Sequence, residues 1–497
     1  MRFDSFAFAI FFPIVVTLFW CAPRYLRLGV LLVSSYYFYM YWRAPYALIL
    51  VLITAIDFCV GIALARSAVP KTRRLILLVS LAANLGILFF FKYYRFAAET
   101  LKEATGKDLL PQLALVLPIG LSFHTFQSMA YSVDVYQRKI EPERHLGRFA
   151  TFIVFFPQLV AGPIERGAEM LPQLRKFADF DYRRVTNGLK LMAWGLFKKV
   201  VIADRLARFV DPVYAHSDLY SGLTLVVATL AFGYQIYCDF SGYTDLALGS
   251  AEVLGIQLRP NFRVPYHATS IQDFWMRWHM SLSTWFRDYV YYPLEFRRAA
   301  ACRGLTAAWA NRVSLGLWTF NILVVFLLSG AWHGANWTFV AWGLYHGILL
   351  IAGRFAHALW KRIGGARSRH RTGFSSALAV LWTFALVTAG WVFFRAPSIH
   401  DASLIVRHVV TNWQSFLTPE RLSYEAARTG WQRWDTTVIV LALLALEIGD
   451  TLGLRLSWRE RLARQPAVIR WCGYYLLVLA IVLCGQFGGP PFIYFQF

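Results

Sequence analysis

Apolar stretches recur along the whole chain and constrain its fold more than any other feature. The chain is 58% hydrophobic and only 16% charged, whereas a soluble chain is about 25% charged. Helices satisfy their own backbone hydrogen bonds in lipid, so these stretches predict an all-α, polytopic membrane protein. The twelve candidate spans lie at roughly 6–20, 28–42, 46–65, 75–91, 112–133, 186–203, 222–238, 313–329, 337–353, 375–394, 436–449 and 469–486.

Two further apolar stretches, 149–163 and 242–256, are short and interrupted by proline or glycine. Broken helices occur at membrane depth where protein or a wet cavity surrounds them. Both stretches are therefore predicted to be re-entrant. No repeat, low-complexity tract or linker divides the sequence, which predicts a single polytopic domain over residues 1–497.

The net charge of +22 has a simple explanation in a membrane protein, because cytoplasmic loops are enriched in Lys and Arg. With the N-terminus outside, the predicted cytoplasmic loops hold 33 of the 50 basic residues and the outer segments hold 13. This distribution of basic residues predicts that both termini lie outside. It also predicts that the protein contacts membrane lipids and has no nucleic-acid partner. The pair Lys198 and Lys199 falls inside the predicted span 186–203 and fits this scheme poorly. The six cysteines form no C-x-x-C pair, so neither a disulfide framework nor a metal site is expected.

The stretch "YCDFSGYTDLALGSAEVLGIQLRPNF" places several polar residues in apolar surroundings. Asp239, Asp245 and Glu252 are the ionisable ones. Such groups at membrane depth usually face a cavity or a partner. Two interpretations stay open, a functional cavity and structural pairing with arginines or helix ends.

The stretch "PYHATSIQDFWMRWHMSLSTWFRDYVYYPL" is predicted to form one amphipathic helix at the cytoplasmic interface. Ser270 would cap it, and Asp273 would pair with Arg277 four residues later. His279 lies beside the apolar stripe, where taken alone a structural histidine is the more ordinary interpretation. The stripe consists of Phe274, Trp275, Trp278, Leu282, Trp285 and Phe286.

His333 stands in "SGAWHGANW", a predicted turn between two apolar spans. A buried neutral histidine can take a proton from a hydroxyl, and its ordinary pKa of about 6.5 suits a general base. Trp332 would help to wall a pocket, and Asn336 would donate a hydrogen bond to a substrate carbonyl. Helix packing and metal binding are the alternatives, although no histidine follows three or four residues later. His346 is thirteen residues further on, about 20 Å along a helix.

Four blocks of sequence stand out, namely "FFPQLVAGPIER" (155–166), "CDFSGYTDLALGSAEVLGI" (238–256), "NFRVPYHATSIQDFWMRWHMSLSTWFRDYVYYPL" (261–294) and "SGAWHGANWTFVAWGLYHG" (329–347), and the chain ends in "FIYFQF". Taken together, they resemble the membrane-bound O-acyltransferase family, in the branch that O-acetylates alginate. The resemblance implies a fold with a transmembrane tunnel and a motif-bearing core at about 115–350. It also implies that His333 is the catalytic histidine and His279 its functional companion.

The resemblance further implies an enzyme of the bacterial inner membrane that moves acetyl from a cytoplasmic thioester, acetyl-CoA, across the membrane to a polysaccharide such as alginate. Arg277 would help to bind this donor, and neither a cofactor nor a metal is expected. Expected partners are a periplasmic SGNH-hydrolase-like acetyltransferase and a polysaccharide biosynthesis complex. A polysaccharide or lipid-carrier transporter and a non-catalytic scaffold remain the alternatives.

Overall fold

The computed structural model describes residues 1–111, 113, 115–159, 162–303, 306–363, 373–453, 458–490 and 492–493. Over these residues the regular structure is helical, without a strand. The chain forms two compact units. The first comprises Met1–Leu196 and Gly242–Pro260, and the second comprises Phe197–Ser241 and Asn261–Phe497. The single-domain prediction stays a prediction.

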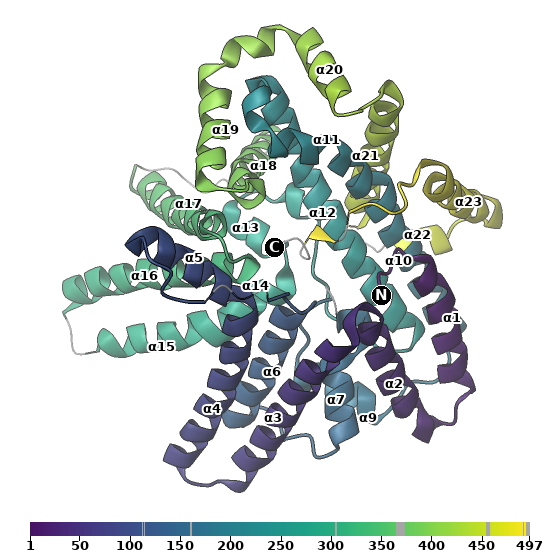
Figure 1. Ribbon diagram of the computed structural model, residues 1–497, viewed down its shortest axis with the longest axis vertical. Coiled ribbons are helices and arrows are strands. Elements are labelled where there is room, and N and C mark those ends of the chain that lie inside the picture. The colour runs from purple at the N-terminus through teal and green to yellow at the C-terminus, as the bar shows by residue number, and fades with distance from the viewer. Residues whose placement is uncertain are drawn as a thin grey trace. The chain divides into compact units, whose positions relative to one another are not determined.

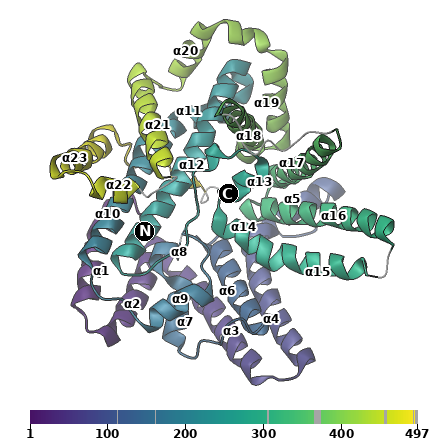
Figure 2. The ribbon, with the colours of Figure 1, turned by 180° about the vertical axis from the view of Figure 1, so that it is seen from behind.

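In the first unit α3, α4 and α6 lie side by side (Figure 1, Figure 2). The buried carboxylate of Asp57 on α3 accepts hydrogen bonds from Ser80 at 2.5 Å, Ser132 at 2.7 Å and Asn84 at 2.8 Å. These bonds join the three helices at a depth where an unpaired carboxylate would be costly. The helices of this unit are α1 (Phe6–Cys21), α2 (Arg24–Arg43), α3 (Ala47–Arg66), α4 (Pro70–Leu88), α5 (Tyr94–Thr105), α6 (Leu121–Tyr136), α7 (Leu146–Val154), α8 (Phe156–Leu159), α9 (Gly167–Arg175) and α10 (Tyr182–Leu196).

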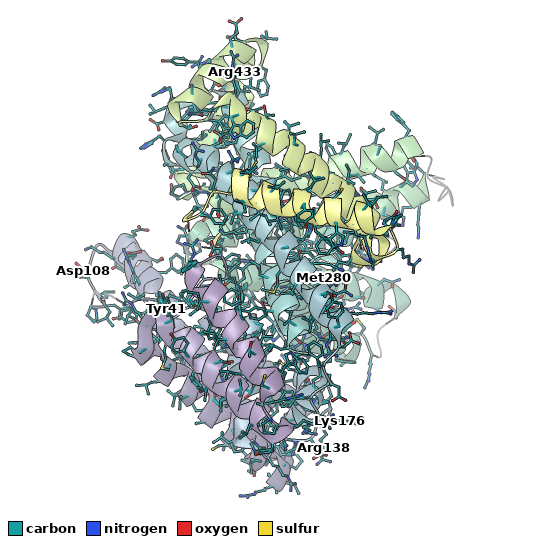
Figure 3. All side chains as sticks on the ribbon, turned by 90° about the vertical axis from the view of Figure 1, so that its right-hand side faces the viewer. Tyr41, Asp108, Arg138, Lys176, Met280 and Arg433 are labelled. Carbon is teal, nitrogen blue, oxygen red and sulfur yellow. The ribbon has the colours of Figure 1, made fainter. Side chains whose placement is uncertain are left out.

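The second unit carries the candidate site residues. Its long helices α16 and α17 pack against each other, and α13 contacts both α17 and α18 (Figure 1). In Figure 3, Met280 marks the start of α14 and Arg433 the start of α21. The helices are α11 (Asp204–Ala215), α12 (Gly222–Val253, whose last part belongs to the first unit), α13 (Ile271–Trp275), α14 (Met280–Phe286), α15 (Tyr292–Ala301), α16 (Ala307–His333), α17 (Trp337–Arg362), α18 (Gly373–Arg395), α19 (Ile399–Thr411), α20 (Pro419–Arg428), α21 (Arg433–Gly453), α22 (Trp458–Ala463) and α23 (Ala467–Cys484).

Seven helical stretches among the described residues are long and apolar enough to cross a membrane. They confirm a multi-pass, all-α membrane protein in outline, while the count of twelve spans stays a prediction. The stretches are Arg24–Arg66, Pro70–Thr105, Gly222–Val253, Trp309–His333, Trp337–Arg362, Gly373–Arg395 and Ala467–Cys484.

Two expectations about helix boundaries are wrong. The stretch 242–256 is not a separate re-entrant segment, because α12 runs unbroken from Gly222 to Val253. Its Gly249 lies so near α10 that a Cβ there would be 2.5 Å from the carbonyl oxygen of Gly188. Gly249, which suggested a break, is therefore a contact point between helices. The predicted span 112–133 also begins too early, since α6 starts at Leu121.

The stretch 149–163 is broken, as expected. Phe155 adopts a non-helical conformation between α7 and α8, while residues 160 and 161 lie outside the described residues.

The predicted single interfacial helix over 265–294 is also wrong. Two short helices, α13 and α14, replace it, and residues between them form a turn. Most of the predicted stripe is core, since Trp278 is fully buried and Trp285 is 4% exposed. A helical stripe in the sequence does not distinguish a lipid-facing surface from a protein-facing one. The local expectations hold, because Ser270 caps α13 and Arg277 pairs with Asp273 at 2.7 Å.

The two lysines that fitted the charge pattern poorly are buried within the second unit. Lys199 forms ion pairs with Asp204 at 2.8 Å and with Asp239 at 2.7 Å. Lys198 donates a hydrogen bond to Ser241 at 2.9 Å. Asp239 therefore has a structural ion pair, although its partner is a buried lysine and not the expected arginine or helix end.

Candidate active site

The hairpin of α16 and α17 places His333. A Cβ added to Gly330 would lie 2.2 Å from the carbonyl oxygen of Phe339, and one added to Gly343 would lie 2.2 Å from that of Phe326. Only glycine permits this approach, so the two helix backbones touch. His333 is the last residue of α16, directly before the turn that the sequence predicted.

His333 lies within a set of aromatic rings. Its side chain is buried, and the residue is only 3% exposed. The ring centroid lies 4.9 Å from Trp342, 5.1 Å from Trp332 and 5.4 Å from Phe394. Tryptophan and phenylalanine rings exclude bulk water, which strengthens electrostatic interactions at the imidazole.

The structure brings His279 next to His333, with ring centroids 6.2 Å apart. The sequence placed them in separate elements, His279 in a predicted helix at the cytoplasmic interface and His333 at a predicted turn between two apolar spans. The ring of His279 also packs edge-on against Phe240 at 4.6 Å and contacts Trp332 at 5.8 Å. The two histidines therefore share one buried chamber.

The backbone of His279 is strained. It has φ +42° and ψ +54°, a left-handed conformation that is rare for a residue with a side chain. Such a conformation costs about 1–3 kcal/mol and persists only where the surroundings impose it. Asn261 supplies part of this constraint, because its carbonyl oxygen accepts Met280 N–H at 2.8 Å and its Oδ1 accepts Ser281 N–H at 3.3 Å.

Complete burial lowers the pKa of His279 to about 3. Desolvation penalises the imidazolium, so the ring is neutral at pH 7. A neutral imidazole can accept one hydrogen bond or proton and donate another.

Three residues that sequence reasoning missed complete the chamber. Trp342 stacks on Trp391 at 5.9 Å with an interplanar angle of 18°, and Trp391 contacts Trp278 at 5.1 Å. His346 follows beyond Trp342, whose ring centroid lies 5.0 Å from that of His346. The sequence "WGLYHG" places His346 one helical turn after Trp342, and the structure buries this histidine completely. Its thirteen-residue separation from His333 hid the connection between the two histidines.

The residues predicted to bind substrate are placed as follows. Trp332 is 3% exposed and borders both histidines. Asn336 caps α17, accepting Thr338 N–H at 3.0 Å, and donates to the carbonyl oxygen of Pro397 at 3.0 Å. Arg277 is tied to Asp273. Their roles in substrate binding stay predictions. Among the described residues no group of three or more His, Cys, Asp or Glu is placed to hold a metal.

Comparison with known proteins decides the family. A family model described as MBOAT, membrane-bound O-acyltransferase family, matches residues 35–306. The chain belongs to this family. The matched region includes His279, and the resemblance deduced from the four blocks is confirmed.

The relatives named below all transfer acyl groups. The peptidoglycan O-acetyltransferase of Helicobacter pylori is 35% identical over 76% of this chain and 73% of its own length. The probable alginate O-acetylase AlgI of Pseudomonas putida is 31% identical over 98% of both chains. The teichoic acid D-alanyltransferase of Bacillus subtilis is 29% identical over 58% of this chain and 71% of its own length. This protein is therefore an acyltransferase of the membrane.

Proposed function

We propose that this protein is an O-acetyltransferase of the bacterial inner membrane. It takes acetyl from a cytoplasmic thioester, acetyl-CoA, and delivers it across the membrane for the O-acetylation of an exported polysaccharide such as alginate. The observation that carries the proposal is the buried pair of His279 and His333, with rings 6.2 Å apart in an aromatic chamber. A pair of imidazoles shielded from water suits proton transfer to and from oxygen and sulfur.

In this mechanism His333 is the general base. The acceptor hydroxyl oxygen attacks the thioester carbonyl carbon, and its proton passes to His333 as the carbon–oxygen bond forms. The tetrahedral intermediate then collapses, the carbon–sulfur bond breaks, and the departing sulfur takes the proton back. His279, in the same chamber, would orient the donor or the carbonyl oxygen. Holding both reactants in one narrow passage provides proximity and orientation.

The passage would be a tunnel open to both sides of the membrane, with the donor entering from the basic cytoplasmic face. The 33 basic residues of the predicted cytoplasmic loops favour a donor that carries phosphates. Arg277, whose side chain is 25% exposed, would contact this donor. On the outer side the acetyl group would pass to a periplasmic SGNH-hydrolase-like partner within a polysaccharide biosynthesis complex. The scheme requires no cofactor.

An acetyl donor is favoured over a D-alanyl donor by the relatives. The acetyltransferases match at 31–35% identity over 76–98% of the chain, whereas the teichoic acid D-alanyltransferase matches at 29% over 58%. Mass spectrometry of the acyl group released from exported polymer by mild base separates acetyl from D-alanyl. Release of D-alanine alone would refute the acetyl assignment.

The decisive variant is His333→Gln, which keeps polarity and approximate size but takes up no proton at neutral pH. We expect acetylation to fall by about 10²–10⁴-fold, the usual contribution of a general base. The measurement compares acetyl esters on exported polysaccharide and on peptidoglycan with the amount of protein in the membrane. The matched control is His400→Ala, at an exposed histidine of α19, which should acetylate normally. A well-accumulated His333→Gln protein with normal acetylation would end the general-base mechanism and favour a transporter or scaffold.

A further inference from the structure

The C-terminal segment, meaning here residues 485–490, 492 and 493 after α23, returns to the interior of the second unit (Figure 1). Gln486 N–H donates to the carbonyl oxygen of Val200 at 2.8 Å, and Ile493 N–H donates to Oδ2 of Asp239 at 2.8 Å. Phe492 and Ile493 are only 2% and 3% exposed. Phe492 and Ile493 therefore contribute to the core of this unit.

An ion cluster anchors this segment. Lys199 bridges Asp204 and Asp239, and its Nζ also lies 3.4 Å from the carbonyl oxygen of Pro490. Gly489 packs so closely on Asp204 that a Cβ there would lie 2.7 Å from its carboxyl carbon. Both carboxylates and the ammonium group are buried, so each needs the others to offset desolvation. Gly489, Pro490 and Ile493 thus lie around a charge cluster that the acyl-transfer mechanism does not use.

The same segment reaches the chamber through one aromatic ring. Phe492 contacts Phe240 with ring centroids 5.5 Å apart, and Phe240 contacts His279 at 4.6 Å. Phe240 directly follows Asp239 on α12, so the residue that binds the tail and the ring that touches the histidine are neighbours. His279 has a strained backbone and needs its surroundings to hold it.

We propose that the C-terminal segment is a positioning element for His279, in which the Lys199–Asp239 pair anchors the tail and Phe492 holds the ring of Phe240 against the imidazole. This role rests on the proposed acyl transfer, since it assigns Phe492 to the same chamber. Phe492 is a positioning residue and does not touch the reacting groups.

The test compares three substitutions in the purified full-length protein. Phe492→Ala removes the ring, Phe492→Leu keeps most of the apolar volume, and Phe487→Ala is the matched control because Phe487 is 58% exposed in the same segment. A displacement of about 1 Å at a catalytic group lowers the rate by about 10²-fold. We therefore expect Phe492→Ala to lower kcat by about 10- to 100-fold with little change in KM for the donor. Phe492→Leu should stay within about threefold of the wild type, because volume-conserving exchanges are tolerated, and Phe487→Ala should be unchanged.

A second readout does not depend on activity. Diethylpyrocarbonate modifies accessible neutral imidazoles, and mass spectrometry locates the modified histidine. His279 is fully buried, whereas His400 is exposed and serves as the internal reference. Phe492→Ala should raise the labelling rate of His279 relative to His400, and Phe487→Ala should not.

The outcomes separate the two proposals. If the wild type shows no acyl transfer, the proposed function fails, but labelling still tests the positioning role. If Phe492→Ala leaves both kcat and His279 labelling at wild-type values, or if Phe487→Ala reproduces its effects, the positioning role is overturned. If Phe492→Ala does not accumulate, Phe492→Val takes its place with the same expectations. Asp239→Asn removes one of the two charge partners of Lys199 and should raise His279 labelling as well; unchanged labelling in this variant would contradict the anchoring role of the pair.

Discussion

A single methyl group at the crossing of α16 and α17 provides a sharp test of the site. A Cβ at Gly330 would lie 2.2 Å from the carbonyl oxygen of Phe339, and carbon–oxygen contacts are ordinary only beyond about 3.3 Å. Gly330→Ala must therefore separate the helices locally by about 1 Å. His333 follows three residues later on the same helix, so the separation moves the imidazole relative to Trp342 on the opposite helix.

The expected magnitudes differ for stability and activity. Overpacking costs about 1–3 kcal/mol, while alanine gains about 1 kcal/mol over glycine in a helix. The net loss in stability is thus about 0–2 kcal/mol. A shift of about 1 Å at His333 lowers the rate by about 10²-fold. Gly330→Ala should therefore fold and accumulate while losing most of its acetylation.

The matched controls are Gly316→Ala on α16 and Gly353→Ala on α17. A Cβ at either position meets nothing within 4 Å, so both variants should unfold at or above the wild-type temperature and acetylate normally. The assay measures acetyl esters on exported polymer against membrane protein abundance, with thermal unfolding of purified protein in parallel. If Gly330→Ala matches Gly316→Ala in both measurements, the backbone contact at Gly330 does not position His333.

Two further predictions concern pH and topology. The pKa of His279 falls from about 6.5 when unfolded to about 3 when folded, so the unfolded chain binds an extra proton between these values and stability should decrease as pH falls through this window. Between pH 7 and pH 5, the unfolding temperature of His279→Gln should therefore fall less than that of the wild type. An equal fall in both proteins would contradict the burial of His279. The topology test uses a background that lacks the exposed Cys21, Cys59 and Cys472. An impermeant thiol reagent added outside should label a cysteine placed at Gln414 and should not label one placed at Arg297. The reverse pattern would invert the predicted orientation.

Features set by local chemistry could be predicted from the sequence. Ser270 caps a helix and Asp273 pairs with Arg277 because both interactions join residues only three or four positions apart. The turn after His333 was visible as small residues between two apolar runs. The four sequence blocks also identified the family, because this recognition depends on the residues of the blocks and their order and not on how the helices pack.

Features set by packing could not be predicted. Gly249 was interpreted as a break because a glycine in an apolar stretch weakens a helix, but the neighbouring backbone of Gly188 gives it a contact role. The stripe of Trp278 and Trp285 was assigned to the cytoplasmic interface of the membrane, although periodicity alone cannot tell which surface a stripe meets. Lys199 conflicted with the charge pattern because its carboxylate partners are identified only by the fold.

The proximity of His279 and His333 also constrains the depth at which the residues around His279 lie. From Ala307 to His333, α16 has 27 residues, a length of about 40 Å at 1.5 Å per residue. This length exceeds the hydrocarbon core of about 30 Å, so a crossing α16 carries His333 far from the end at Ala307. His279 lies 6.2 Å from His333, and it must therefore share that depth rather than sit at the cytoplasmic surface. We therefore predict that α13 and α14, which flank His279, lie at the same depth as His333. Hydropathy does not register them as spans because they have only five and seven residues, and in the proposed mechanism this depth would bring a cytoplasmic donor to His333.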